Sequence, residues 1–412
     1  MHSVTSYLHL LRDSSRNARL YFITASLIGF TLEGVHVLLF NLYLLRLGYG
    51  PEFIGLINGI GMCAFAIFSL PAGRLTQRWG CRRTMLTGLV LVIVGYGLLL
   101  LVELEPGVGR NSWLIASYMV AAVGAAVYFV NTAPFLMNAT SGKERNHVFS
   151  VYAAIGSLAG FAGNLAGGIL PTFLSLVLED SLSQPAPYRW ALLTATLFIL
   201  PAILIVRATT PDSPPQRTSG QHVGRGSSRF SLILLLSLIR MLTITSLAVV
   251  HFFFNVYLDA GLKVPIAHIG IVMAIGRLLA APAALIMPIL TSRWGNGGAA
   301  LWSSLGPAIS LIPLALFSHW GAASLGFVAV MVLASIRYPT FMIYTMEVVS
   351  PEQRGIASGA GEMAAGGSFA FMALSGGFLI TALGYHSLFL TGAVLTGIGT
   401  FMFWLNFKNQ VR

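Results

Sequence analysis

The chain has 412 residues, of which 56% are hydrophobic and only 9% are charged, and its formal net charge is +11. An ordinary soluble domain carries about 25% charged residues, so this chain is too poor in charge to cover a water-exposed surface. Its composition therefore argues against a soluble enzyme and indicates a protein that lies in a lipid bilayer.

Twelve apolar runs follow one another along the chain, and a helix of about 20 such residues crosses a hydrocarbon layer of about 30 Å. Helices are expected because an isolated strand in lipid would leave its backbone groups unpaired. Residues 1–19 are polar and show no signal-peptide pattern, so we expect the first run to stay as a helix. The predicted spans are residues 20–46, 53–73, 84–103, 112–137, 147–177, 189–206, 231–258, 265–290, 299–318, 321–346, 355–383 and 386–407. The sequence thus predicts an all-α membrane protein with 12 transmembrane helices.

The basic residues are distributed unequally between the two sides of the predicted membrane. Of the 24 lysines and arginines, 17 fall on one side of the spans, 4 on the other and 3 inside spans. The positive-inside rule then predicts that both termini lie in the cytoplasm, in a multi-pass protein of the inner cell membrane. The basic residues lie in short loops without interleaved aromatic residues, so no nucleic-acid partner is expected.

The longest polar stretch, residues 207–230, is rich in Pro, Ser, Gly and Arg. Such a composition cannot bury a core and is typical of a linker. We therefore expect an N-terminal six-helix half at residues 1–206, a cytoplasmic linker at 207–230 and a C-terminal six-helix half at 231–412.

The two halves repeat one another in sequence. The matching pairs are Phe40–Leu44 with Phe254–Leu258 at an offset of 214, Leu75–Gly80 with Leu290–Gly295 at 215, and Gly167-Gly168 with Gly376-Gly377 at 209. Several matches in the same order are not a coincidence. They predict two related six-helix bundles.

The loop after the second span carries the most specific motif. The loop is similar to the pattern Gly-x-x-x-Asp-Arg-x-Gly-Arg-Arg at Gly73, Arg78, Gly80, Arg82 and Arg83, with Cys81 inserted before the two arginines. With the repeat and the topology, this motif resembles the major facilitator superfamily, in its branch of bacterial proton-coupled drug and metabolite exporters. The resemblance implies a conformational gate at this loop, in which Gln77 stands in place of the acidic residue. The alternative is a loop that only anchors topology.

The fifth predicted span is rich in glycine. Gly156, Gly160, Gly163 and Gly167 are spaced to share one helix face, where small residues let helices approach closely. The stretch Gly163–Gly168 also resembles the ending of the family's antiporter motif, with Asn164 in place of proline. Close packing and an export function both remain open. The arginine of the family's drug exporters is missing from span four, since residues 112–137 carry no charge.

Five charged residues fall inside the predicted membrane region: Glu33, Arg240, Arg277, Arg337 and Glu362. An embedded charge costs at least ~2.5–3.5 kcal/mol at a helix centre, so it indicates function by default. We expect at least one embedded ion pair, formed by Arg277 or Arg337 with Glu33 or Glu362. Arg240 lies near the inner interface, where snorkelling would explain it.

These residues and their neighbours give the candidate site. Glu33 lies in mid-span with His36 one turn later, so we expect a shared face and, with Glu362, a role in proton coupling. The alternative is a structural carboxylate. The predicted residues of the substrate cavity are Asn41, Tyr128, Asn131, Asn255, Arg277 and Arg337.

The motifs of ATP-driven transport and of metal-dependent catalysis are missing from the sequence. We therefore expect no enzyme activity, no cofactor, no metal and no ATP. The predicted function is secondary active transport by alternating access, as proton-coupled export of an amphipathic or drug-like compound. Proton symport of an organic anion into the cell, and a lipid flippase or scramblase, remain as alternatives. The expected partners are a small-molecule substrate, protons and the lipid bilayer, around a monomer.

Overall fold

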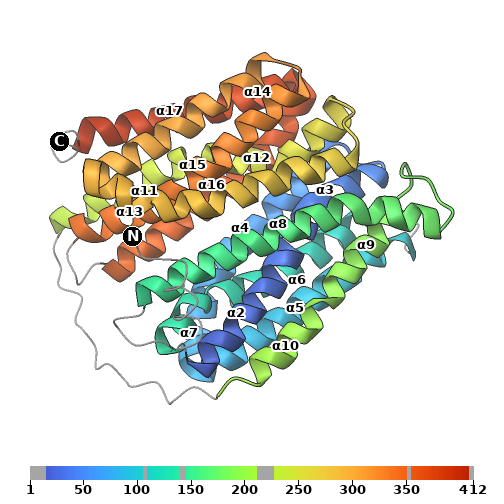
Figure 1. Ribbon diagram of the computed structural model, residues 1–412, viewed down its shortest axis with the longest axis horizontal. Coiled ribbons are helices and arrows are strands. Elements are labelled where there is room, and N and C mark those ends of the chain that lie inside the picture. Colours follow the sequence, from blue (N-terminus) through green and yellow to red (C-terminus); the bar gives the residue numbers. More distant parts are fainter. Residues whose placement is uncertain (1–14, 105–108, 140–144, 211–226, 350–353, 408–412) are drawn as a thin grey trace. The chain divides into compact units, whose positions relative to one another are not determined.

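A computed structural model describes residues 15–104, 109–139, 145–210, 227–349 and 354–407. Within these ranges all regular structure is helical, and twelve helical spans are long and apolar enough to cross a membrane. The predicted all-α membrane fold with twelve spans is confirmed (Figure 1). The described segment 317–319 separates the ninth and tenth spans, which nearly abut in the sequence.

The helices form two compact units. Unit 1 comprises Met1–Leu47 and Cys63–Arg217, and unit 2 comprises Gly48–Met62 and Thr218–Arg412. The elements before the polar stretch at 211–226 are α2 (Arg16–Ile28), η1 (Gly29–His36), α3 (Val37–Arg46), α4 (Pro51–Trp79), α5 (Cys81–Leu100), η2 (Val102–Leu104), α6 (Arg110–Phe129), α7 (Thr132–Ala139), α8 (Arg145–Val177), α9 (Ala186–Leu197) and α10 (Ile199–Arg207). Those after it are α11 (Ser227–Thr243), α12 (Thr245–Val256), η3 (Tyr257–Gly261), α13 (Ile266–Ser310), α14 (Ile312–Leu316), α15 (Trp320–Val348), α16 (Arg354–Leu383) and α17 (Tyr385–Phe407).

The first turns of α4 pack with α16 inside unit 2. A Cβ atom on Gly55 would lie 3.1 Å from the backbone nitrogen of Gly377, and a Cβ on Gly377 would lie 3.0 Å from Cα of Glu52. Contacts this short leave no room for a side chain, so the two glycines bring the helix backbones together.

Two glycines at matching positions reverse the chain between spans. Gly80 (φ +81°) separates α4 from α5, and Gly295 (φ +66°) joins the two spans within α13. Both adopt a backbone conformation that is essentially restricted to glycine. Since 295 minus 80 is 215, the turns follow the offset of the sequence repeat.

The first span contains the π-helical segment η1, which packs closely on α8. A Cβ atom on Gly34 would lie 2.5 Å from Cα of Gly163, and one on Gly29 would lie 3.2 Å from the carbonyl oxygen of Gly156. The predicted glycine face of the fifth span therefore does allow close helix approach. π-Helical turns inside α-helices are frequent at functional sites, and this one carries Glu33 and His36.

Candidate functional site

Unit 1 holds a buried histidine on η1. His36 is 2% exposed, and its Nε2 lies 3.1 Å from Oγ1 of Thr196 on α9. Because the Thr196 hydroxyl donates to the carbonyl of Leu192 at 2.8 Å, it accepts from His36, so the proton is assigned to Nε2. Nδ1 of His36 then offers a lone pair, and it has no hydrogen-bond partner among the described residues.

A row of aromatic rings extends from this histidine. The ring of Tyr96 on α5 lies 4.0 Å from that of His36, and Tyr118 on α6 lies 6.3 Å from Tyr96, measured between centroids. Glu33 is half-buried and acts electrostatically on Tyr96. Glu33 and His36 therefore both approach one tyrosine. The site thus brings a carboxyl and an imidazole, both titratable side chains, to the same tyrosine.

Unit 2 holds an embedded ion pair. Nη2 of Arg240 on α11 lies 2.6 Å from Oε1 of Glu362 on α16. The Tyr338 hydroxyl on α15 donates to the same oxygen at 3.3 Å, and the Arg240 guanidinium lies 5.4 Å from the centroid of the Tyr338 ring. The Arg240 side chain is 9% exposed and that of Glu362 is 56% exposed. The pair thus joins a buried cation to an accessible carboxylate.

A second buried arginine lies beside this pair. Arg337 is 4% exposed and donates from Nη1 to Oγ1 of Thr243 at 3.1 Å. No carboxylate in the part of the chain that the structure describes lies within 4.0 Å of its guanidinium. It also repels Arg240 electrostatically. Unit 2 therefore places a second buried cation near the Arg240–Glu362 pair.

These contacts correct two predictions. An embedded pair exists, but the arginine that pairs with Glu362 is Arg240, which was discounted, and a pair of Arg277 with Glu33 stays a prediction. Arg240 is buried in a cluster and does not snorkel. The depth of Arg240 along its helix could be estimated from the sequence, but its contact depends on the helix face it occupies, which the sequence does not show. Thr243, which contacts Arg337, was missed, although it lies three residues after Arg240 on the same helix face.

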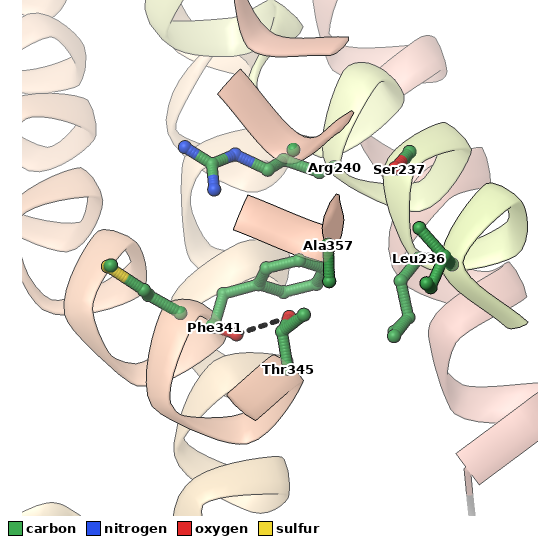
Figure 2. Close-up of a pocket in the computed structure, with 9 residues that line it drawn as sticks. Leu236, Ser237, Arg240, Phe341, Thr345 and Ala357 are labelled. Atoms are coloured by element: carbon green, nitrogen blue, oxygen red, sulfur yellow. Dashed lines mark hydrogen bonds between the residues drawn. The ribbon is translucent and has the colours of Figure 1, made fainter. Parts of the chain in front are cut away.

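A small pocket opens beside Arg240 between α11, α15 and α16 (Figure 2). Its free space is about 10 Å³, which is about enough for one water molecule. Arg240 lies at one end, and Phe341 and Thr345 lie at the other, where the Thr345 hydroxyl donates to the Phe341 carbonyl at 2.8 Å. The remaining lining residues are Ile233, Leu236, Ser237, Met342, Ala357 and Gly361. The pocket therefore combines one cation and two hydroxyls with apolar walls.

Two of the predicted cavity residues lie inside unit 1. Tyr128 is 1% exposed and belongs to its hydrophobic core. Asn131 is fully buried at the break between α6 and α7, where its Nδ2 donates to the Val127 carbonyl at 2.7 Å and its Oδ1 accepts from the Thr76 hydroxyl. Asn131 thus ties the helix break to the motif at the end of α4. A substrate contact for either residue stays a prediction.

The remaining predicted cavity residues divide between the two units. Asn41 is buried in unit 1. In unit 2, Asn255 is buried and its Oδ1 accepts from the Val256 nitrogen at 2.9 Å, while Arg277 is half-buried on α13. All three have interactions within the chain, and their roles in substrate binding also stay predictions.

The predicted gate motif is described in part. Arg78 and Arg83 are exposed, Gly80 makes the turn, and Nη1 of Arg82 donates to the Thr209 carbonyl at 3.0 Å. The surroundings of Gly73 and of the Gln77 side chain, the other two motif positions, lie outside what the structure describes. The Arg82 contact ties this loop to the end of the sixth span.

A polar cluster at the opposite end of unit 1 was missed in the sequence. Nη1 of Arg189 lies 2.6 Å from Oε2 of Glu103, and the Tyr43 hydroxyl donates to Oε1 of Glu103 at 3.2 Å. Arg46 donates from Nη2 to the Tyr188 hydroxyl at 3.1 Å. These residues come from separate loops and helix ends, so no local pattern brings them together. The cluster links α3, η2 and α9.

Known proteins resemble this chain in sequence and in fold. Residues 21–364 match the Major Facilitator Superfamily. A relative in Mycobacterium tuberculosis, the multidrug resistance protein Stp, is 30% identical over 184 residues, which are 44% of this chain but only 33% of that protein. Among solved structures, the nucleoside transporter NupG has a TM-score of 0.74 at 15% identity, covering 95% of this chain and 100% of that one. The xylose transporter XylE from E. coli has a TM-score of 0.73 at 12% identity, covering 93% and 96%.

Proposed function

Because the chain belongs to the major facilitator superfamily, we propose that it is a proton-coupled secondary transporter that exports a small amphipathic compound. We take from the family that the chain is a membrane transporter. What we propose is its coupling ion, the direction of transport and the kind of substrate.

The observation that carries the coupling is the Glu33 site in unit 1. Glu33 and His36 lie on the π-helical segment, and both approach Tyr96. Glu33 is a half-buried carboxyl inside a membrane span, which is the kind of side chain that proton relays of transporters use. His36 lies one turn further along η1, and its Nδ1 has no hydrogen-bond partner among the described residues.

Two comparisons support the kind of substrate and the coupling. The relative Stp is named a multidrug resistance protein, which favours an amphipathic, drug-like substrate and export. A structure of similar fold, with a TM-score of 0.74 at 11% identity, is titled a D-xylose-proton symporter. We also propose that the protein lies in the inner cell membrane as a monomer with both termini in the cytoplasm, as the distribution of its basic residues predicts.

A second candidate is uptake of an organic anion by proton symport. The observation that favours it is the positive charge in unit 2, where Arg240 pairs with Glu362 and the nearby Arg337 contacts only the Thr243 hydroxyl among the described residues. Direction separates the candidates, since an exporter moves its substrate against the inward flow of protons.

The test is transport by purified protein in sealed proteoliposomes with an imposed pH gradient. Three tracers of similar size would be compared: benzoate, benzamide and benzylamine. We expect movement of a tracer that depends on the gradient and reverses when the gradient is reversed. Equal tracer movement with and without a gradient would contradict proton coupling. Movement of fluorescent phospholipid without a gradient would instead support the flippase alternative.

A further inference from the structure

We propose that Arg240 and Arg337 form a binding site in unit 2 for the carboxylate of an amphipathic organic anion, and that Glu362 occupies this site as an internal anion when substrate is absent. This inference rests on the proposed function, that the chain carries a small amphipathic compound, and it names the class of that compound.

The burial of Arg337 is the first observation. A guanidinium that is 4% exposed has lost most of its hydration, and the hydroxyl of Thr243 at 3.1 Å is the one hydrogen-bond acceptor the structure gives it among the described residues. An arginine in such a place is costly unless an anion compensates it. Its planar group of five N–H donors matches the two oxygens of a carboxylate. Arg337 is therefore suited to an anion that the described residues do not supply.

The charge count of the cluster is the second observation. Arg240 and Arg337 contribute two positive charges and Glu362 contributes one negative charge, so the cluster carries an excess of one positive charge. A single bound carboxylate would neutralise it. Glu362 is 56% exposed, so its side chain can leave Arg240 for water at little cost. An incoming carboxylate can thus replace Glu362 on Arg240.

The pocket beside Arg240 is the third observation. Its walls at Leu236 and Phe341 are apolar, and Figure 2 shows the Arg240 side chain at one end of them. Gly361 on α16 makes this placement possible, because a Cβ atom there would lie 3.0 Å from Nη1 of Arg240. The pocket itself has room for about one water molecule, so a carboxylate on Arg240 would place its apolar body outside it, at the mouth lined by the exposed Met342. The site therefore suits an anion with an apolar body better than a small inorganic anion.

The repeat gives the fourth observation. The positions in unit 1 that match Arg240, Arg337 and Glu362 are Ser26, Tyr128 and Ala153, at offsets of 214, 209 and 209. None of these three is charged, although unit 1 contains the spans that match those of the cluster. The bundle therefore does not require this cluster, and binding explains its presence.

The test is the thermal unfolding of the purified full-length protein with increasing benzoate, using uncharged benzamide as the matched probe. A ligand that binds the folded state raises the unfolding temperature. In Glu362→Gln the internal competitor is gone, so the benzoate concentration for half of the maximal shift should fall roughly tenfold relative to the wild type. Benzamide should have no effect on either protein. Equal benzoate concentrations for the two proteins, or equal effects of benzoate and benzamide, would overturn the site.

A second variant tests the arginine. Arg337→Gln should lose the stabilisation by benzoate, whereas Arg293→Gln, which removes an exposed arginine elsewhere in unit 2, should keep it. Retention of the benzoate effect in Arg337→Gln would overturn the assignment. If this variant does not fold, the comparison of Glu362→Gln with the wild type still tests whether the anion site exists.

The failure of this inference is distinct from the failure of the proposed function. Gradient-driven transport without any preference for benzoate binding would overturn the anion site alone. Benzoate binding that depends on Arg337, in a protein that does not respond to a pH gradient, would overturn proton coupling and leave the site in place.

Discussion

Units 1 and 2 share packing contacts at positions that match in the sequence repeat. Phe40 stacks on Tyr118 in unit 1 with ring centroids 4.6 Å apart, and Phe254 stacks on Phe327 in unit 2 at 4.1 Å. The first residues of the stacks differ by 214 positions and the second by 209, as in the sequence repeat. An aromatic pair between the first and fourth spans of each unit is thus a property of the fold.

A second packing contact occurs at matching positions in both units, although its two residues differ. Gly124 packs on Leu91 in unit 1, and at the matching positions Leu333 packs on Gly306 in unit 2. The small and the large residue have exchanged helices. The total volume at the contact is conserved, which is the kind of change that packed interiors tolerate best.

The embedded charges do not follow the repeat. Glu33 and His36 of unit 1 match Leu247 and Val250 of unit 2 at the offset of 214. Conversely, Arg337 matches Tyr128 of the hydrophobic core of unit 1. Apolar and small residues therefore build both bundles, and each unit adds its own charges. The positions at which the units differ in charge are the best candidates for function.

The largest expected effect comes from exchanging Tyr128 and Arg337. Tyr128→Arg would bury an unpaired cation in the core of unit 1, which costs several kcal/mol, about 3–5 where a buried charge loses its partner. We expect this variant to fail to fold. Arg337→Tyr removes a buried cation and should leave the thermal unfolding temperature unchanged or higher, while transport is lost. A folded Tyr128→Arg protein with wild-type stability would contradict the difference between the two cores.

A smaller effect is expected where η1 meets α8. Gly163→Ala would place a Cβ atom 2.8 Å from Cα of Gly34, and backbone atoms cannot move aside as a side chain can. We expect a loss of about 1–3 kcal/mol, measured as a lower unfolding temperature in detergent. Gly156→Ala on the same helix is the matched control, because a Cβ there would have no neighbour within 4 Å. Equal stability of the two variants would show that the close approach is not maintained.

The smallest effect is expected at the Gly–Leu contact whose two residues are exchanged between the units. Gly124→Ala meets the backbone nitrogen of Val92 at 2.6 Å, whereas Gly306→Ala meets only the side chain of Leu333, at 2.5 Å from Cδ1. The flexible leucine can adopt another rotamer at a cost of about 0.5–1.5 kcal/mol. We therefore expect Gly306→Ala to lower the unfolding temperature less than Gly124→Ala. The reverse order would mean that the contact in unit 2 is the more rigid one.

The fold could be predicted from the sequence because each of its determinants is local. The length of the apolar runs set the spans, as at residues 84–103, and the glycine spacing in span five predicted its close contact. The turn at Gly80 was likewise part of a recognisable motif.

The contacts of the site depend on which face a helix presents, and this is not local. Arg240 and Glu362 are 122 residues apart in the chain, and depth alone made Arg277 and Arg337 look like better partners for the glutamate. Asn131 meets Thr76 across 55 residues, so its position in the core was also hidden. The bond that ties His36 to Thr196 spans 160 residues.

Proton coupling through Glu33 is the central claim, and Glu33→Gln tests it most directly. The variant and the wild type would be compared in proteoliposomes, first for accumulation of a tracer driven by a pH gradient and then for exchange of tracer at equal pH. The substitution keeps the shape of the side chain and removes its titration. We expect accumulation to be abolished while exchange is retained, because binding and conformational change do not need the proton in the exchange assay. Accumulation by Glu33→Gln at the wild-type level would contradict the claim.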